Sequence, residues 1–341
     1  MGNSCTCISE DLKDKQEFRN ETMTSRRNKE DSIVKIQKNF RGYKARKVYT
    51  QMKIDIRSGN TIENKPEFLN ESDVVLNPMI KAISDKLGPF QFQDMGQWRN
   101  IPRQKRPPYK LGNGAIYIGE WNTQTNKREG RGKQIWPDGS LYEGEWRIDK
   151  ANGKGRLIHS DGDVYEGEWV SDKAEGFGIY THMDGAQYQG QWREDKQHGK
   201  GKESWPDGAM YEGDYIMGKK HGVGEFLWSD GSIYIGQFQN NNIEGQGEYK
   251  WADGRIFNGQ WMFNKMHGKG IFTWPDNRRY EGEYIEDKKQ GFGVFYWPDG
   301  RKYMGQWANG KQHGKGTFVA VNGLSRDGEW LSGKRSKWLD E

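Results

Sequence analysis

The sequence predicts an all-β repeat protein: an elongated, antiparallel, single-layer sheet of stacked 23-residue hairpins, preceded by an N-terminal extension that is partly α-helical and otherwise disordered. Two observations predict this fold. A Tyr-x-Gly-x-aromatic frame recurs at a fixed interval through most of the chain. In addition, only 33% of the 341 residues are hydrophobic, whereas 13% are aromatic and 46 are Gly. Disordered chains are poor in aromatic residues, so these rings indicate regular order.

The repeat frame sets the period of the array. Every interval between successive frames is 23 residues except the first, which is 25 because residues 123–128 include two extra residues in a loop. Arg326 stands 23 residues after the ninth frame, with Gly328 and Trp330 still in phase, which is typical of a degenerate unit that caps a repeat array. The nine frames begin at Tyr117, Tyr142, Tyr165, Tyr188, Tyr211, Tyr234, Phe257, Tyr280 and Tyr303.

Side-chain alternation predicts one aromatic face in each unit. Tyr142, Gly144 and Trp146 share one face of a strand, and the two intervening glutamates share the other. Because glycine has no Cβ, a ring can lie directly over its Cα, so these positions form the predicted repeat core. The equivalent core residues of the next two units are Tyr165, Gly167, Trp169, Tyr188, Gly190 and Trp192.

Asp-Gly pairs mark the expected tight turns, because both residue types tolerate the positive φ that such turns need. Only Asp276-Asn277 and Asn322-Gly323 depart from this pair in the later units. A single hairpin is marginal in water, so the units must stack on one another to become stable. Ten units predict about twenty strands, and at roughly 4.8 Å per strand the sheet would extend about 95 Å before twist shortens it.

This pattern resembles that of the MORN repeat family, whose signature is approximately Y-x-G-x-W, then a Gly-x-Gly strand and a D-G turn. The resemblance covers residues 117–330. It is similar to long ciliate MORN proteins and to the repeat arms of plant phosphatidylinositol-phosphate kinases, junctophilins and radial-spoke head proteins. The resemblance implies a binding or scaffolding array without a reaction of its own, and it implies dimerisation through the array as one possibility.

The first residues match an acylation signal. Gly2 follows the initiator methionine and Thr6 occupies the hydroxyl position of the myristoylation pattern. Cys5 and Cys7 are then candidates for palmitoylation, which would supply the second anchor that stable membrane attachment needs. The alternative is a coincidental Met-Gly start with two chance cysteines. No secretory signal or long apolar run occurs, so the expected location is the cytosolic face of a plasma or ciliary membrane.

A basic amphipathic helix is predicted over residues 31–53. Ten Lys or Arg between residues 26 and 53 oppose two acidic residues, a local charge of +8. Basic amphipathic helices suit acidic calmodulin-like proteins or anionic lipid surfaces. The segment also resembles the IQ motif, which implies calmodulin or another EF-hand protein as partner. The implied calmodulin-binding residues are Ile36, Gln37, Phe40, Arg41, Gly42 and Arg46. An isolated, solvated helix is the alternative.

The sequence thus divides into an acylated flexible N-terminus (1–30), the IQ helix (31–53), a linker (54–110) and the repeat array (111–341). Within the linker, Asn77 and Pro78 begin a short helix that extends to residue 87, before Gly88. We expect its apolar stripe to cover the open first edge of the sheet. Five basic residues in 98–110 either contact phosphate headgroups or belong to a solvated linker.

Other chemistry is not expected. The Gly-x-Gly pairs precede strands and no P-loop occurs, so they are structural glycines. His198, His221, His267 and His313 recur at one repeat position, but adjacent units place equivalent residues about 9.6 Å apart, too far to share a metal ion. No catalytic residue, metal or cofactor is therefore predicted. Residues 111–341 hold 31 basic and 34 acidic residues, a balance of −3 that does not favour nucleic acid.

These observations predict a non-enzymatic, membrane-tethered scaffold that binds an EF-hand protein through the IQ helix and organises partners or phospholipid membrane through its repeats. Two alternatives stay open. The array could act in trans as the regulatory arm of a phosphoinositide kinase, or it could be a structural component of a ciliary or cortical assembly attached to the cytoskeleton.

Overall fold

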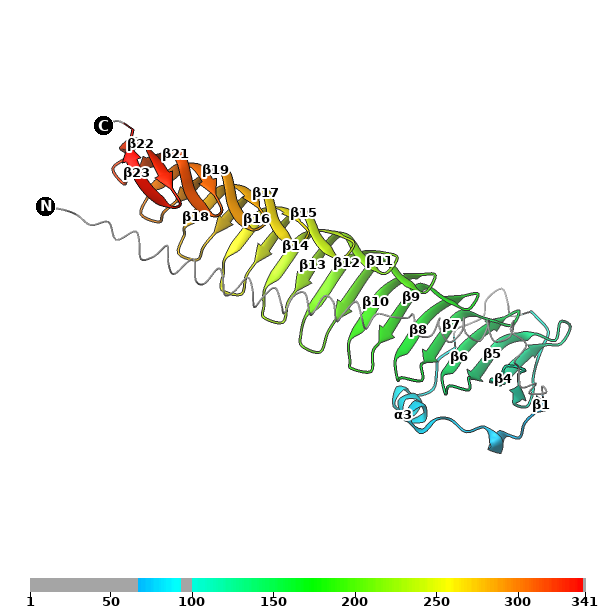
Figure 1. Ribbon diagram of the computed structural model, residues 1–341. Coiled ribbons are helices and arrows are strands. Elements are labelled where there is room, and N and C mark those ends of the chain that lie inside the picture. Colours follow the sequence, from blue (N-terminus) through cyan, green and yellow to red (C-terminus); the bar gives the residue numbers. More distant parts are fainter. Residues whose placement is uncertain (1–66, 93–99, 340–341) are drawn as a thin grey trace. The chain divides into compact units, whose positions relative to one another are not determined.

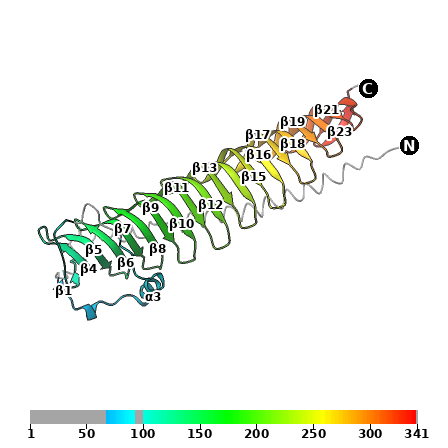
Figure 2. The same cartoon turned by 180° about the vertical axis from the view of Figure 1, so that it is seen from behind.

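The computed structural model describes residues 67–92 and 100–339. The chain separates into two units, residues 1–64 and residues 65–341. The predicted acylation residues Gly2, Cys5 and Cys7 and the predicted IQ residues 36–46 lie outside the described residues. In the second unit, successive strands lie side by side in one open, twisted sheet (Figure 1, Figure 2).

The described residues contain 23 strands in a single sheet, one short 3-10 helix and one α-helix. The helices are η1 (Glu71–Asp73) and α3 (Pro78–Leu87). The strands are β1 (Glu67–Phe68), β2 (Arg103–Lys105), β3 (Tyr109–Lys110), β4 (Ile116–Asn122), β5 (Arg128–Ile135), β6 (Leu141–Arg147), β7 (Lys150–Ile158), β8 (Val164–Val170), β9 (Lys173–Thr181), β10 (Gln187–Arg193), β11 (Lys196–Ser204), β12 (Met210–Ile216), β13 (Lys219–Leu227), β14 (Ile233–Gln239), β15 (Asn242–Lys250), β16 (Ile256–Met262), β17 (Lys265–Thr273), β18 (Arg279–Ile285), β19 (Lys288–Tyr296), β20 (Lys302–Ala308), β21 (Lys311–Val319), β22 (Ser325–Leu331) and β23 (Lys334–Trp338).

Every strand from β4 to β23 pairs antiparallel with the next strand along the chain, as in β6 with β7 and β7 with β8. The predicted all-β, open, single-layer array is thus confirmed, and its twenty repeat strands match the expected number. At the N-terminal end, β4 also pairs with β2 and with β3, and β3 pairs with β1. Short strands therefore cover the first edge of the sheet, so the prediction that the linker helix covers it is wrong.

Helix α3 instead packs on the face of the sheet opposite the tyrosines. Asn77 Oδ1 caps it by accepting a hydrogen bond from the backbone N–H of Met79, and Gly88 ends it with φ +74°. Its fully buried Ile80 packs against Ile135, Leu141 and Ile158, which lie where β5, β6 and β7 meet their loops. These sheet residues are apolar on a largely polar face because the helix covers them, which removes their surface from water.

Two kinds of connection alternate along the array. From β6 onward, each first strand joins its second strand through a two-residue turn, such as Ile148-Asp149, whose residues have φ of 48° and 64°. Such angles belong to the turns that match the twist of a hairpin. In the first unit, residues 123–127 form a longer connection between β4 and β5. The Asp-Gly pairs lie elsewhere, in longer loops between units: Gly139 has φ +92°, and its N–H bonds to the carbonyl of Trp136. The prediction that Asp-Gly pairs supply the positive φ of tight turns is thus confirmed, but these turns join successive units and not the two strands of one unit.

Each hairpin also contains a bulge that the alternation pattern does not predict. In the second unit, Gly144 pairs with Gly155 but Trp146 pairs with Ala151, so the register shifts between them. The side chain of Glu145 lies against the shifted backbone, where its Oε2 accepts a hydrogen bond from Lys154 N at 3.2 Å. The recurring acidic or amide residue before the second ring of the frame therefore holds the bulge, in addition to facing solvent.

Candidate binding surfaces of the repeat array

The repeat core consists of tyrosine rings that lie over paired glycines. A Cβ on Gly144 or Gly155 would lie 2.3–2.6 Å from atoms of the Tyr142 ring, so only glycine leaves room for it. The Tyr142 hydroxyl donates a hydrogen bond to the carbonyl of Glu145 at 3.1 Å. The indole N–H of Trp146 donates to the carbonyl of Gly132 in the preceding unit at 3.2 Å, which joins neighbouring units.

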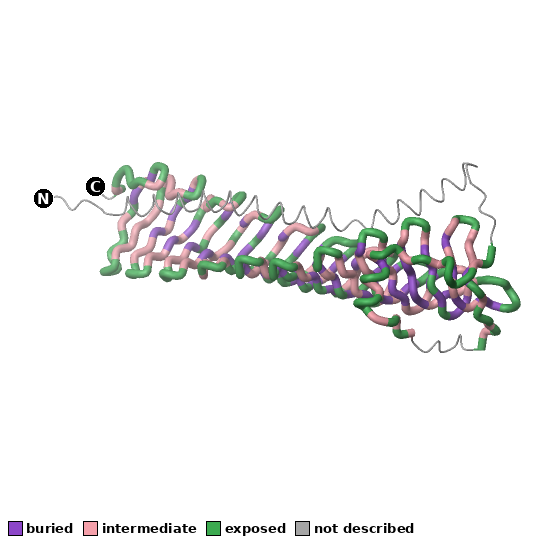
Figure 3. The backbone as a smooth tube through the Cα atoms, turned by 90° about the horizontal axis from the view of Figure 1, so that it is seen from below, coloured by how far each residue is buried: buried purple, intermediate pink, exposed green. Residues whose placement is uncertain are grey.

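These rings form an unbroken edge-to-face ladder. Tyr142 contacts Trp146 of its own unit and Trp169 of the next unit, with centroid separations of 5.2 and 5.3 Å. The same alternation continues to Tyr303, whose ring contacts Trp307 and Trp330. The ladder includes the other predicted core rings, namely Tyr165, Trp169, Tyr188 and Trp192, over Gly167 and Gly190. Buried residues accordingly recur across the strands (Figure 3).

Burial keeps the ladder tyrosines neutral. It raises the pKa of Tyr303 to about 12 and the pKa of Tyr142 well above the ordinary value of 10.0. The hydroxyl of each tyrosine that begins a frame donates to a backbone carbonyl, as shown for Tyr142, so these tyrosines act as structural donors. The ladder therefore makes a stiff support, and the surfaces that meet solvent must carry any binding.

A second row of rings lies beside the ladder in the C-terminal half. Trp251, Trp274 and Trp297 are half-buried and alternate with Phe272 and Phe295, which are buried. Each of these tryptophans is faced by the guanidinium of an Arg four residues later, and that Arg bonds to the Asp between them. The three sets are Trp251, Asp253 and Arg255; Trp274, Asp276 and Arg278; and Trp297, Asp299 and Arg301.

Two lysines lie among the rings, which the sequence analysis did not predict. Lys220 is buried, and its Nζ lies 2.5 Å from Oε2 of buried Glu203, which also accepts a hydrogen bond from the Tyr215 hydroxyl at 3.0 Å. The Nζ of Lys289 lies 4.9–5.0 Å from four ring centroids, including those of Trp274 and Trp307. Their sequence signal is a Lys at the repeat position that holds Ala, Gln, Ile or Met in six other units.

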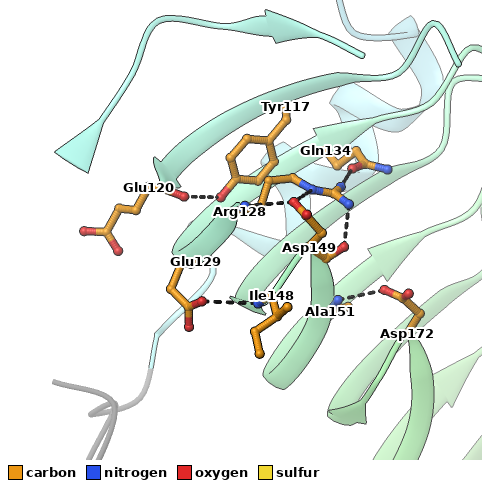
Figure 4. Close-up of polar contacts among 9 residues, drawn as sticks. All are labelled: Tyr117, Glu120, Arg128, Glu129, Gln134, Ile148, Asp149, Ala151 and Asp172. Atoms are coloured by element: carbon orange, nitrogen blue, oxygen red, sulfur yellow. Dashed lines mark hydrogen bonds and ion pairs between the residues drawn. The ribbon is translucent and has the colours of Figure 1, made fainter. Parts of the chain in front are cut away.

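The two-residue turns fasten each unit to the one before it (Figure 4). Asp149 Oδ1 accepts a hydrogen bond from Arg128 N at 2.9 Å, and Asp172 Oδ1 accepts one from Ala151 N at 2.8 Å. Glu129 Oε2 accepts from Ile148 N at 3.2 Å. Because the same backbone groups recur every 23 residues, this contact repeats along the edge of the array.

The recurring histidines occupy the position of Glu129 in this fastening. Nδ1 of His198 lies 3.4 Å from Met217 N, in the place where Glu129 receives Ile148 N. No cluster of three or more His, Cys, Asp or Glu side chains able to hold a metal ion occurs among residues 67–92 and 100–339. His198 thus takes part in a contact between hairpins.

One cluster of titratable groups lies where the loop between β7 and β8 meets the end of β9. Burial alone would raise the pKa of Asp163, but hydrogen bonds from His182, Tyr180 and Met183 N lower it to about 2. Burial lowers the pKa of His159 from 6.5. Asp163 is therefore ionised and His159 neutral at physiological pH, and the carboxylate is satisfied by three hydrogen bonds.

No helix within the described parts of the chain is long and apolar enough to span a bilayer. A model of the IQ calmodulin-binding motif matches residues 30–50, and a search of curated proteins finds no match to this chain.

Among solved structures, the chain is similar to the TCP10 domain of Danio rerio CPAP in complex with a STIL peptide, at 14% identity over 69% of this chain and 98% of that one, with a TM-score of 0.38. The TCP10c domain of Drosophila melanogaster Sas-4 matches at 14% identity over 52% and 96% of the two chains, with a TM-score of 0.25. Virginiamycin B lyase from Staphylococcus aureus matches at 12% identity over 67% and 88%, with a TM-score of 0.14.

The MORN repeat model matches nine consecutive segments that together cover more than half of the chain: residues 117–141, 142–164, 165–187, 188–210, 211–233, 234–254, 257–277, 280–300 and 303–325. Each matched segment begins at the second residue of the first strand of a hairpin. The two families that match are a repeat family and a binding motif. The chain belongs to the MORN repeat family.

Proposed function

We propose that this protein is a non-enzymatic scaffold, tethered by acyl chains to the cytosolic face of a membrane, that recruits a calmodulin-like EF-hand protein. One observation carries the proposal: an IQ calmodulin-binding motif and an array of MORN repeats occur in the same chain. The array supplies a stiff body because its rings contact one another without interruption from unit to unit. The IQ segment supplies a site for an acidic partner, since its local charge is +8.

The full chain is expected to retain calmodulin in a pull-down. Ile36→Asp combined with Arg41→Ala should abolish retention, because the first change places a charge at the apolar anchor and the second removes an ionic contact. Arg26→Ala with Arg27→Ala is the matched control, since it lowers the charge of the same basic segment outside the motif. Assays with calcium and with a chelator define the calcium dependence. Absence of calmodulin from both eluates of the wild-type chain would refute this part of the proposal.

Membrane attachment is expected to depend on Gly2. Gly2→Ala removes the acceptor of the myristoyl group and should move most of the protein from the membrane pellet to the soluble fraction. Asn3→Ala is the control, because it leaves the acylation pattern intact. Cys5→Ser with Cys7→Ser should give an intermediate distribution, since a single myristoyl chain binds a bilayer only marginally. If Gly2→Ala pellets like the wild type, the acyl tether is wrong.

A further inference from the structure

The two long edges of the repeat array differ in charge. The turn edge consists of the nine two-residue turns, each with the residue before it and the residue after it: 147–150, 170–173, 193–196, 216–219, 239–242, 262–265, 285–288, 308–311 and 331–334. It holds ten Lys or Arg and six Asp or Glu, a net charge of +4. The loop edge consists of the nine loops between units: 136–140, 159–163, 182–186, 205–209, 228–232, 251–255, 274–278, 297–301 and 320–324. It holds nine Asp and three Arg, a net charge of −6.

Lysines form a regular row along the turn edge. A Lys follows eight of the nine turns, and only Asn242 interrupts the row. The lysines are Lys150, Lys173, Lys196, Lys219, Lys265, Lys288, Lys311 and Lys334. Of the six acidic residues of this edge, Asp149, Asp172, Asp195 and Asp287 place a carboxylate oxygen on a backbone N–H of the preceding unit. The other two, Glu194 and Glu286, lie 3.7 and 3.5 Å from the Nζ atoms of Lys173 and Lys265. Four of the six carboxylates are thus engaged with backbone and two with lysines of the row.

Large apolar side chains lie directly across from five of these lysines. Val170 pairs with Lys173, Ile216 with Lys219, Met262 with Lys265, Ile285 with Lys288, and Leu331 with Lys334. Three turns also carry an apolar residue at their tip, namely Ile148, Met217 and Phe263. All eight of these apolar residues are between 38% and 66% exposed. The turn edge thus presents pairs of an exposed apolar side chain and an ammonium group.

The fold does not require the apolar tips. Ile148, Met217 and Phe263 have φ of 48°, 50° and 49°, which is the left-handed region where a bulky side chain is unfavourable. Asn240 and Asn309 occupy the same turn position with φ of 51° and 52°, and asparagine suits that region better. A Phe or Ile at this position is therefore less favourable for the turn than an Asn.

The two edges act separately on their surroundings. Strands of seven to nine residues hold them roughly 25 Å apart, whereas the screening length at physiological ionic strength is about 8 Å. An anionic surface therefore attracts the turn edge and repels the loop edge. Lysines beside apolar side chains suit the interface of an anionic bilayer, because the apolar groups enter the boundary of the acyl chains while the ammonium groups meet lipid phosphates.

We propose that the turn edge of the array is a contact surface for anionic membrane lipid. The inference rests on the membrane function proposed above and names the side of the array that faces the bilayer. It differs from the tether because it requires no acyl chain. The membrane would meet the sheet along its edge, which leaves both faces and the loop edge accessible to protein partners.

Two probes in one unit test the orientation directly. An environment-sensitive fluorophore is attached at Met217→Cys on the turn edge or at exposed Ser229→Cys between Trp228 and Asp230 on the loop edge, each in a full chain that carries Cys5→Ser and Cys7→Ser and has no myristoyl group. With vesicles of phosphatidylserine and phosphatidylcholine, the probe at 217 should shift to the blue and the probe at 229 should not. Equal responses at both positions, or silence at 217, would overturn the proposal. The basic IQ segment could bind the same vesicles, but it would not distinguish residue 217 from residue 229.

Vesicle flotation of substituted chains supplies the second measurement. Lys219→Gln, Lys288→Gln and Lys334→Gln together should weaken binding roughly 100-fold, at roughly fivefold for each lysine near an anionic surface. Lys250→Gln, Lys269→Gln and Lys315→Gln remove the same charge from exposed positions on the sheet face and should have little effect. Equal losses in the two sets would contradict an edge-specific contact.

The apolar tips are tested by Ile148→Asn, Met217→Asn and Phe263→Asn, which suit the left-handed turn position and so preserve the fold. Their combination should weaken vesicle binding about tenfold, and an unchanged affinity would overturn the apolar part of the contact. If the acylated chain pellets with cell membranes but the probe at residue 217 does not respond to vesicles, the acyl tether is supported and the edge contact is refuted. Loss of pelleting in Gly2→Ala, together with an intact response at 217, would support both.

Discussion

Gly247→Val is expected to unfold the middle of the array, with a loss of roughly 4 kcal/mol in the free energy of unfolding. A Cβ on Gly247 would lie 2.3–2.5 Å from atoms of the Tyr234 ring, and the backbone there has no positive φ, so the ring is the obstacle. Displacing the ring breaks its hydrogen bond to the carbonyl of Gln237 and its edge-to-face contacts with Phe238 and Trp261. The ladder would be interrupted at that unit.

Urea unfolding and hydrogen exchange check this prediction. Amides of β14 to β17 should exchange faster in Gly247→Val, because each unit is stabilised by its neighbours. Gln246→Val is the matched control on the same strand, since Gln246 is exposed and its substitution should change stability by less than about 0.5 kcal/mol. The double variant with Tyr234→Ala and Gly247→Val should lose about 1–3 kcal/mol less free energy of unfolding than the two single losses add up to. Strict additivity would show that the ring and the glycine do not compete for space.

Alkaline pH is expected to destabilise the array as a whole. Burial raises the pKa of twelve tyrosines above 10.0, and these are Tyr117, Tyr142, Tyr165, Tyr180, Tyr188, Tyr211, Tyr215, Tyr234, Tyr249, Tyr280, Tyr284 and Tyr303. A group whose folded pKa is raised contributes stability that is fully present below its unfolded pKa. Above pH 10 the unfolded chain loses protons that the folded chain keeps, so the free energy of unfolding falls.

The thermal midpoint measured across this range checks the prediction. It should change little below pH 9 and fall steeply between about pH 10 and 12, and tyrosinate absorbance should appear together with unfolding. Tyrosinate that forms gradually in a chain that keeps its circular dichroism would mean that the hydroxyls are accessible, and would contradict the buried ladder.

The repeat frame predicted the features that follow from period and alternation. Tyr142, Gly144 and Trp146 share a face, the ring covers paired glycines, and the strands form an open single layer. Each of these features depends on a local spacing that recurs in nine units. An error in assigning one unit would therefore be inconsistent with the other eight. The IQ motif could also be recognised from the sequence, because its defining positions lie within one short segment.

The remaining features depend on contacts that the frame does not encode. Ile148-Asp149 forms a tight turn without glycine because it is bonded to the preceding unit: Asp149 accepts a hydrogen bond from Arg128 N, and Glu129 accepts one from Ile148 N. Ile80 lies on the sheet face because Leu141 and Ile158 offer an apolar patch there, whereas three short strands already cover the first edge. Both are interactions between distant residues, and periodicity within one unit does not report them.

Distances between equivalent turn positions test the central claim most directly. Spin labels at Ser171 and at Met217, Phe263 or Asn309, in a chain with Cys5→Ser and Cys7→Ser, mark turns two, four and six units apart. Because each unit adds two strand spacings, the separations should rise in nearly equal steps to about 19, 38 and 58 Å, less the shortening by twist. A separation that stops rising beyond the first pair would show a closed or compact body and would contradict the stacked, open array.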